Sequence, residues 1–539
     1  MRWESLALAG LMIGSGILSA CSGSTKDADT GQDTSAPALT ACEDGVPARP
    51  FTTEGVGVQF GEVAGDFTVE TLDGSFTLSE AWNGCDTFVV VSYFENAEGD
   101  ALWSSDPSEL LANAPKNSQF LFVSDEGGPA RREQRVQAMK DTLNLGKRRA
   151  DRVHFVLDRV SRIKGGLGDF VADYLEYQAD SLVEIDDSRS SSAPLPWFIG
   201  IDRFQTWDPG GNIDDVVGGN PQVSFAGFLP QFYNHKAQLA HRLDAETVTE
   251  IELVNQEVTE RVFPVTVDLP SDISAFDTME FDVEVTCKAR NPFACSEWDR
   301  IARIEWCTSE TCEERREVAR WITPYWRRGN RRWAIDASPF LGLVGSGSQT
   351  FRIVMGPDWE RATPRDARIA LRLSTQGKAR ASSAKRVFTG GSFDAKYNEN
   401  RKPVTIDVPA GASKVELVTI LSGHGQAAGT NCSEWCDHRH RFSVDGQEAV
   451  LIQPEGAVGA SLECAPAAAQ GVPPGQWGNW APLRAYWCPG LPVEARITDL
   501  TSLVTPGQSA SLTYEGFFAG SDVGAGGNID LSAYVVYYE

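Results

Sequence analysis

The four residues Cys-Ser-Glu-Trp occur twice in the sequence, at positions 295–298 and again at 432–435. Around both copies the chain consists of short runs of alternating apolar and polar residues, with Gly, Pro and Asp between the runs. In residues 368–373, Ile369 and Leu371 alternate with arginine and alanine, the pattern of a strand with one face in a core. Strands with this spacing build sandwiches or jelly rolls, and the repeated phrase predicts two of them side by side.

The strands expected beyond residue 246 follow one another with almost no helical periodicity between them. They are residues 263–267, 281–285, 351–355, 368–373, 404–408, 415–420 and 533–538. We assign residues 246–385 to a first β-sandwich and residues 386–539 to a second. Their boundary is expected in the Gly/Ser/Ala-rich stretch 377–396.

Residues 43–245 have the pattern of an α/β domain. Residues 87–93, TFVVVSY, form an unbroken apolar run rich in β-branched side chains, typical of a strand buried on both faces. Further strands are expected at 119–124, 153–158 and 197–201. Helices are expected after Pro129, where Val136, Met139 and Leu143 recur at helical spacing, and at 170–177. Strands that alternate with helices predict a largely parallel sheet.

This domain resembles the thioredoxin-like and peroxiredoxin-like families. The resemblance lies in residues 61–67, the turn 72–74 and Leu78 ahead of a buried strand, and in Pro196, where those families keep a cis-proline. Residues 94–100, where the redox cysteines would lie, contain no cysteine, and thiol exchange needs a thiolate. We therefore expect a redox-inactive thioredoxin-like domain that acts as a spacer or presents the substrate.

The first residues indicate export. Arg2 precedes a mostly apolar run, residues 6–18, that is too short to span a bilayer and is followed by Ser-Ala-Cys. This pattern resembles a bacterial lipoprotein signal, residues 1–21, with Cys21 as the lipidated residue, and Ser22 favours the outer membrane. The alternative is an ordinary secretory signal. Residues 22–42, poor in bulky apolar side chains, are expected to be a disordered tether.

The charge limits the class of partner. A formal net charge of -26 argues against nucleic acid and against an anionic membrane surface, because both would repel the chain. The charge does not argue against neutral sugars. We therefore expect no nucleic-acid partner, and contact with a membrane only through the lipid anchor.

The cysteines fit an oxidising compartment. Of the 11 cysteines, those left after Cys21 are even in number. By proximity in the sequence the expected pairs are Cys287 with Cys295, Cys307 with Cys312, Cys432 with Cys436, Cys464 with Cys488, and Cys42 with Cys85. Zinc is a weaker explanation, since no two CxxC motifs occur and the chain has only 6 histidines.

Four motifs in order along the C-terminal part resemble the bacterial peptide-N-glycosidase F family, whose members cleave the bond between an asparagine side chain and its N-linked glycan. They are residues 287–300, residues 321–326 with 335–336, residues 422–423 with 432–440, and residues 478–490. The family fold is two eight-stranded antiparallel sandwiches side by side, with the active site in the cleft between them. The resemblance thus implies a multi-domain chain: a thioredoxin-like α/β domain followed by two antiparallel β-sandwich (jelly-roll) domains.

Carried over residue by residue, the resemblance implies that Asp299 is the principal catalytic carboxylate and Glu434 the second. It implies that Arg300 and Arg484 contact the substrate. Hydrolysis of an asparagine amide requires an activated water and a proton for the leaving glycosylamine, and two carboxyl groups with separated pKa values can divide that work. The resemblance implies N-glycosylated proteins or peptides as substrates and calls for neither a cofactor nor a metal.

The expected sugar contacts are less uniform. Trp298, Trp435, Trp480 and Trp487 offer aromatic faces for the first sugar rings, although each is also a good core residue. A third acidic residue of the family is matched by Pro357, with Asp358 and Glu360 as substitutes. His424 and Gln426 stand where the family has a Trp and a His. The sugar preference is therefore expected to differ from the family's.

Two other classes of protein remain open at this point. Two-sandwich copper monooxygenases share the architecture, and His438 and His440 would face one side of a strand, where they could ligate a metal. A noncatalytic glycan-binding protein on the cell surface would use the same carboxylates to hold sugar hydroxyls.

Overall fold

The structure is a computed structural model, and the residues that it describes make up most of the chain from Ala41 onward. They are residues 41–143, 150–184, 198–210, 222–287, 298–325, 329–359, 364–425, 432–459, 462–476, 479–518 and 526–539. Residues 41–539 form a single unit. The predicted lipoprotein signal, its Cys21 and most of the tether lie outside the described residues. Among the described helices, none has both the length and the apolar character needed to cross a membrane.

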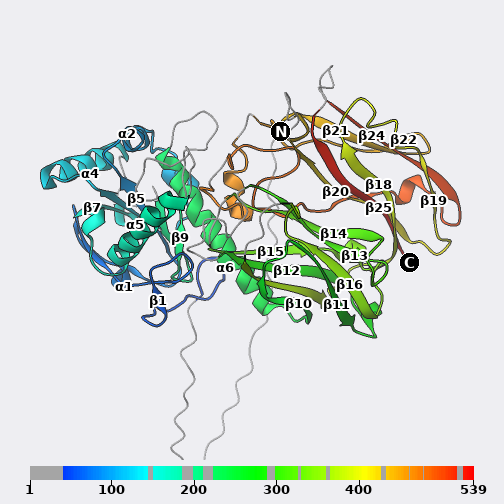
Figure 1. Ribbon diagram of the computed structural model, residues 1–539, viewed down its shortest axis with the longest axis horizontal. Coiled ribbons are helices and arrows are strands. Elements are labelled where there is room, and N and C mark those ends of the chain that lie inside the picture. The colour runs from blue at the N-terminus through cyan, green and yellow to red at the C-terminus, as the bar shows by residue number, and fades with distance from the viewer. Residues whose placement is uncertain are drawn as a thin grey trace, which may run out of the picture. The chain divides into compact units, whose positions relative to one another are not determined.

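The α/β domain is built on a seven-stranded sheet in the order β4-β3-β7-β6-β5-β8-β9. Its strands β5, β7 and β9 are labelled in Figure 1. The strands are β3 (Thr68–Thr71), β4 (Gly74–Thr77), β5 (Thr87–Tyr93), β6 (Ser118–Ser124), β7 (Val153–Arg159), β8 (Phe198–Ile201) and β9 (Trp207–Pro209). A separate pair, β1 (Val56–Gly57) and β2 (Val63–Ala64), precedes them. All seven residues of β5 are buried, as the apolar run predicted.

The helices of this domain lie between and after the strands. They are α1 (Leu78–Ala81), α2 (Ala97–Ser104), α3 (Leu110–Asn113), α4 (Pro129–Leu143), α5 (Gly166–Glu184) and α6 (Phe228–Ala245), with short 3-10 turns η1 (Ala150–Arg152), η2 (Val160–Arg162) and η3 (Val223–Gly227). The helix expected to begin at Pro129 is confirmed as α4.

The prediction of a largely parallel sheet is correct only for its centre. β5, β6 and β7 are parallel, because α2, α3 and α4 carry the chain back between them. β3, β4, β8 and β9 are antiparallel to their neighbours. The thioredoxin-like assignment stays a prediction, and Pro196 lies outside the described residues.

The first sandwich packs two four-stranded antiparallel sheets. One has the order β10-β17-β12-β15, formed by β10 (Thr249–Val258), β17 (Arg365–Ser374), β12 (Thr278–Cys287) and β15 (Gly329–Asp336). The other has the order β11-β16-β13-β14, formed by β11 (Val262–Leu269), β16 (Gly347–Val354), β13 (Ile301–Cys307) and β14 (Arg315–Ile322), with the turns η4 (Ile273–Ala275) and η5 (Ser338–Phe340). Ile369, Leu371 and Leu373 of β17 are fully buried, which confirms the predicted core face. Ala370 and Arg372 on the other face are buried as well, so the prediction of a strand with only one buried face is wrong here.

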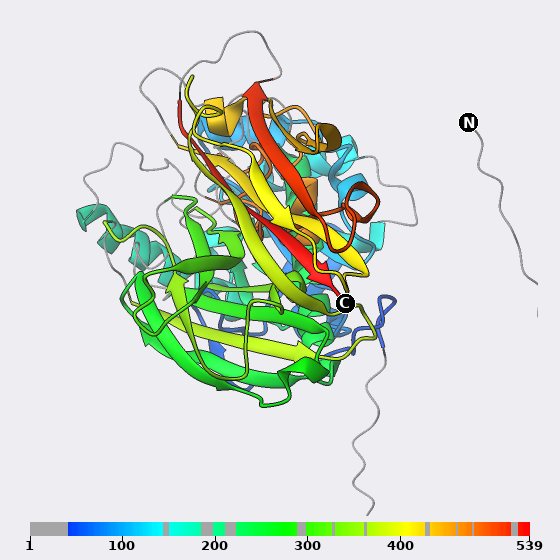
Figure 2. The same ribbon diagram turned by 90° about the vertical axis from the view of Figure 1, so that its right-hand side faces the viewer.

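The second sandwich repeats the arrangement. One sheet has the order β18-β25-β20-β23, formed by β18 (Ala381–Ser392), β25 (Asn528–Tyr538), β20 (Lys414–His424) and β23 (Arg496–Asp499). The other has the order β19-β24-β21-β22, formed by β19 (Val404–Asp407), β24 (Ser509–Phe518), β21 (His438–Val444) and β22 (Gln447–Ile452). The short helix α7 (Cys432–Trp435) and the turns η6 (Pro466–Gln470) and η7 (Thr501–Leu503) complete it. The yellow β20 and the red β25 run side by side in Figure 2.

The boundary between the sandwiches lies between Ser374, where β17 ends, and Ala381, where β18 begins, so it overlaps the start of the expected stretch and precedes the assigned break after residue 385. The small-residue stretch that suggested a linker is the long strand β18, which pairs with β25 of the second sandwich. The pairing register shifts at several points along this ladder. Gly and Ser are tolerated here because a long antiparallel ladder, rather than side-chain packing, holds the strand.

Buried charge joins the two sandwiches. Arg320 on β14 is fully buried, and its guanidinium lies 2.9 Å from the carboxylate of Asp530 on β25 and 2.8 Å from the hydroxyl of Ser422 on β20. Its other side pairs with Glu317, which accepts a hydrogen bond from Ser532 at 2.6 Å. A buried guanidinium is tolerated only when its donors are satisfied, so this cluster fixes the relative placement of β14, β20 and β25.

Four of the five predicted disulfides are present. They are Cys42–Cys85, Cys307–Cys312, Cys432–Cys436 and Cys464–Cys488. For the fifth pair, Cys287 is at the end of β12 and Cys295 lies outside the described residues.

Candidate active site

Asp299 lies directly before β13 of the first sandwich. The backbone of this segment is held by Thr323, whose hydroxyl accepts a hydrogen bond from the Arg300 amide at 2.8 Å and donates one to the Trp298 carbonyl at 3.2 Å. The Asp299 side chain is 11% exposed. It therefore sits at the edge of a strand that the fold holds firmly, with a small opening to solvent.

Glu434 belongs to α7, in the loop before β21 of the second sandwich. The disulfide Cys432–Cys436 closes this single turn, and Ser433 anchors it through its hydroxyl to the Gly526 carbonyl at 2.7 Å. Gly423 at the end of β20 must be glycine, because a Cβ there would lie 1.8 Å from the Ser433 carbonyl oxygen. The Glu434 side chain is 13% exposed.

Arg484 brings the two acids into one site. Its Nη2 lies 3.6 Å from Oδ2 of Asp299, and its Nε lies 3.7 Å from Oε1 of Glu434. The side chain is fully buried, and its guanidinium carbon lies 4.5 Å from the ring centroid of Trp435 and 5.2 Å from that of Trp487. Each sandwich therefore supplies one acid, and a single arginine from the segment before β23 neutralises both in part.

The burial of the two acids changes their proton affinity. Loss of hydration raises the pKa of Asp299 to about 6, although the charge of Arg484 opposes the shift. Burial, together with the negative charge of Asp299, raises the pKa of Glu434 to about 8. Near neutral pH the two carboxyl groups together therefore hold one proton, and the lower pKa of Asp299 makes it the more readily ionised of the two.

Tyr325 is a member of the site to which the sequence analysis gave no role. Its hydroxyl accepts a hydrogen bond from Arg484 Nη2 at 2.9 Å and forms one with the Asp299 carboxyl. Burial and the neighbouring carboxylate raise the pKa of Tyr325, so it stays protonated. The residue lies in the second motif, 321–326, which was the only signal in the sequence that could have identified it.

Arg484, expected to contact the substrate, has no exposed surface with which to do so. Its Nη1 donates to the Pro482 carbonyl at 2.8 Å, and its remaining contacts are with the two acids, Tyr325 and aromatic rings. Arg300 is half-buried, and its guanidinium carbon lies 4.9 Å from the ring centroid of Trp359. Trp359 is 73% exposed, and Asp358 beside it is also exposed.

The four predicted sugar-contacting tryptophans divide into two pairs. Trp298 and Trp435 are half-buried beside the acids. Trp480 is 1% exposed and packs in a core cluster. Trp487 is 4% exposed, and the His424 ring stacks on it with the ring centroids 4.8 Å apart. The last two have almost no free face for a sugar ring. Glu360 and Gln426 lie outside the described residues.

A buried hydrogen-bond chain supports the loop of Glu434. His438 Nε2 donates to the Ser433 carbonyl at 2.8 Å, which leaves Nδ1 to accept from His440 Nε2 at 2.8 Å. His440 Nδ1 then accepts from the Tyr514 hydroxyl at 2.7 Å, and Tyr514 accepts from Tyr397 at 2.7 Å. Burial lowers the pKa of His438 to about 4 and that of His440 well below its usual range.

These hydrogen bonds also test the alternative of a copper monooxygenase, in which His438 and His440 would ligate a metal. All four imidazole nitrogens of His438 and His440 have hydrogen-bond partners within the protein, so no lone pair points at a metal. Within the described part of the chain, no group of three or more His, Cys, Asp or Glu side chains is placed to hold a metal ion.

The Tyr514→Phe variant is expected to lose about 1–3 kcal/mol of unfolding free energy, because His440 Nδ1 becomes a buried acceptor without a donor. Urea denaturation measures this. Tyr537→Phe is the matched control, since the Tyr537 hydroxyl is buried with no hydrogen-bond partner and its removal should cost nothing. Equal losses in both variants would contradict the proposed support of the Glu434 loop.

The C-terminal part of the chain is similar to known proteins. Residues 392–536 match the family described as peptide-N-glycosidase F, C terminal. The chain is 28% identical over 276 residues to the peptide-N(4)-(N-acetyl-beta-D-glucosaminyl)asparagine amidase F of Elizabethkingia miricola. The aligned region covers 46% of this chain and 70% of that protein.

Solved structures were also found. One is PNGase F, a glycosylasparaginase from Flavobacterium meningosepticum, at 22% identity, 55% coverage of this chain, 96% of that chain and a TM-score of 0.41. Another is PNGF-II, which is 12% identical; the match covers 56% of this chain and 67% of that chain, with a TM-score of 0.43. By these sequence matches, the C-terminal half of this chain is similar to peptide-N-glycosidase F.

Proposed function

We propose that the protein is a peptide-N4-(N-acetyl-beta-glucosaminyl)asparagine amidase, which hydrolyses the side-chain amide that joins asparagine to an N-linked glycan. The observation that carries the proposal is the position of Arg484, which lies within 4 Å of one acid from each sandwich. Two partly exposed carboxyl groups with different pKa values can serve as the general base and the general acid of a hydrolase.

The chemistry follows from which acid holds the proton. Ionised Asp299 takes a proton from a water molecule, and the water oxygen bonds to the amide carbon of the glycosylated asparagine. Protonated Glu434 then gives its proton to the amide nitrogen as the C–N bond breaks. The products are an aspartate in the peptide and a glycosylamine, and one water is consumed. Asp299 ends the reaction protonated and Glu434 ends it ionised, so a proton must pass from Asp299 to Glu434 before the next turnover.

Positive charge assists this reaction. Arg484 and Arg300 both lower the pKa of Asp299 by their charge, which keeps part of its population ionised in spite of burial. Arg300, unlike Arg484, is half-buried and can also face the developing oxyanion. One such interaction typically contributes about 3 kcal/mol to transition-state stabilisation in a dry site.

The test is product analysis of a defined N-glycopeptide in ¹⁸O-labelled water. An amidase converts the asparagine to aspartate with one ¹⁸O in its carboxyl group. An intact asparagine that retains one sugar would instead indicate an endoglycosidase. Binding without any cleavage would favour a glycan-binding protein, and either result would reject the proposal.

We propose that this activity belongs outside the cytoplasm, where N-glycosylated substrates are met. The support is the lipoprotein-like signal ending at Cys21 and the confirmed disulfides. Metabolic labelling with a radioactive fatty acid, compared between the native chain and Cys21→Ala, tests the lipid anchor.

A further inference from the structure

The segment from Cys464 to Cys488, which carries Arg484, packs on the α/β domain. Trp480, four residues before Arg484, is buried in the same core cluster as β5, β6 and α6, and its ring meets the edge of Phe225 with centroids 6.1 Å apart. Phe225 lies in η3, directly before α6. Cys464, Ala468, Val472 and Cys488 belong to the same cluster. The segment's apolar side is therefore covered by the first domain.

A second contact lies further along α6. His235 on α6 donates a hydrogen bond to the Ala469 carbonyl of η6. Gly471 ends η6 with φ of +112°, and a Cβ there would lie 2.8 Å from His235 Nε2. Only glycine allows so close an approach at this φ. α6 and η6 are thus fitted to one another.

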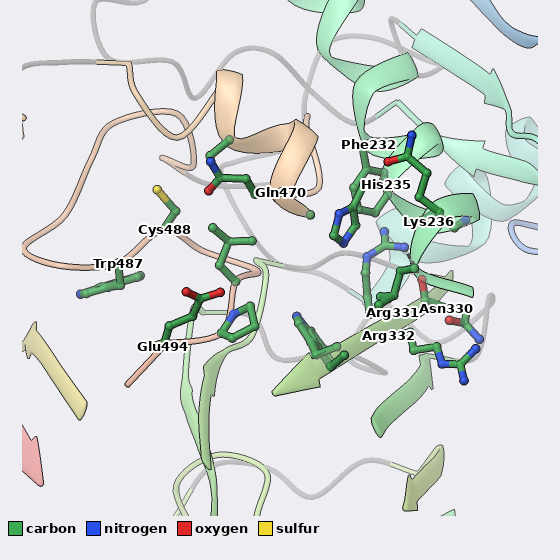
Figure 3. A pocket seen from close by; sticks show the side chains of 18 of the residues that line it. Phe232, His235, Lys236, Asn330, Arg331, Arg332, Gln470, Trp487, Cys488 and Glu494 are labelled. Carbon is green, nitrogen blue, oxygen red and sulfur yellow. Dashed lines mark hydrogen bonds between the residues drawn. The ribbon is translucent and has the colours of Figure 1, made fainter. Parts of the chain in front are cut away.

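Beyond these contacts the two elements separate around a cavity of about 1070 Å³, lined by α6, β15 and the segment before β23. Figure 3 shows His235 and Lys236 on one side and Gln470, Cys488 and Trp487 on the other. The ring of Trp487 lies 5.2 Å from the Arg484 guanidinium carbon. The segment has space beside it, and its contacts with the first domain include Trp480 in the core cluster and the hydrogen bond at η6.

The connection from Trp480 to the guanidinium is short. The Cys464 amide donates to the Ala481 carbonyl at 3.0 Å, and the Pro482 carbonyl accepts from Arg484 Nη1 at 2.8 Å. The disulfide Cys464–Cys488 closes the segment on itself. Two residues of backbone thus connect Trp480 with the carbonyl that accepts from Arg484, whereas Ala485 on the other side of Arg484 is hydrogen-bonded to Glu434 and Gly423 of the second sandwich.

We propose that the α/β domain is a positioning element of the active site: by holding Trp480 and η6 it fixes Arg484 between Asp299 and Glu434. This rests on the proposed amidase function for its catalytic consequence. It gives the first domain a role that needs no redox cysteine.

The test compares two truncations in the full chain, Phe225→Ala and Phe76→Ala. Both phenylalanines are 6% exposed and in the same cluster, but Phe76 packs on Phe67, Phe88 and His154, within the α/β domain. With both variants folded, Phe225→Ala is expected to lower kcat on the order of 10-fold, because misplaced catalytic groups cost about that much or more. Phe76→Ala should leave kcat unchanged, and Phe225→Leu should restore most of the rate.

Hydrogen exchange separates this inference from the proposed function. Amides of residues 479–488 should exchange at least about tenfold faster in Phe225→Ala than in the native chain, with no change in Phe76→Ala. Equal exchange in both variants, or an equal loss of kcat in both, would overturn the inference. If the native chain hydrolyses no glycopeptide, the amidase proposal fails and the exchange result alone decides the positioning role.

Discussion

In the Asp299→Asn variant, kcat for glycopeptide hydrolysis is expected to fall by about 10³-fold, because the base that activates water is lost. Binding of the glycopeptide should change little, since asparagine has nearly the same shape. The fold should be at least as stable at pH 7. The pKa of Asp299 is raised in the folded protein, so its ionised form costs stability above its ordinary pKa, and asparagine removes that cost.

Steady-state kinetics, binding titration and thermal unfolding measure the three quantities. Asp268→Asn is the control, because Asp268 is an exposed carboxylate on β11 of the same sandwich. A kcat close to that of the native chain in Asp299→Asn would reject Asp299 as the base.

The Arg484→Gln variant should lose kcat by about 10²-fold or more and should also lose stability at neutral pH. Removing the buried arginine between the two acids leaves Arg300 as a cation near Asp299 but weakens the charge that opposes desolvation, so the pKa values of Asp299 and Glu434 both rise. The base is then protonated at pH 7. Breaking a buried ion pair in this way costs about 3–5 kcal/mol.

The loss of stability in this variant has a predicted sign with pH. Because the folded pKa values of both acids are raised, protonation favours the folded state, and the variant should regain stability as the pH falls toward 5. Urea denaturation at pH 5 and pH 7 measures the difference. Arg496→Gln, a partly exposed arginine on β23, is the control. If Arg484→Gln were as active and as stable as this control, the coupling role of Arg484 would be wrong.

The fold could be predicted closely where side-chain pattern decides it. The apolar run of β5 correctly predicts a strand buried on both faces. The alternation in β17 predicts its core face, but not the burial of Ala370 and Arg372 on the other face. Residues 377–396 predict a domain boundary because their small side chains carry no alternation, but most of them form β18. The strand directions at the sheet edges carry no local signal. These features depend on pairing with distant strands.

For the candidate site, the resemblance to the family identified Asp299 and Glu434, and in the structure both acids lie within 4 Å of Arg484. The burial of Arg484 could not be read from residues 478–490, because it results from packing against two sandwiches and, through Trp480, the first domain. The same holds for Tyr325, whose contacts with Asp299 and Arg484 span most of the C-terminal half. A local motif identifies residue types, and only the assembled fold shows which of them face one another.

The central claim is that Asp299 and Glu434 share one proton. The most direct test is the pH dependence of kcat/KM in the native chain and in Glu434→Gln. For the native chain we expect a bell, rising as Asp299 ionises near pH 6 and falling as Glu434 ionises near pH 8. In Glu434→Gln the alkaline limb should disappear and the acid limb should stay near pH 6, at a lower rate. An alkaline limb that persists unchanged in Glu434→Gln would contradict the account.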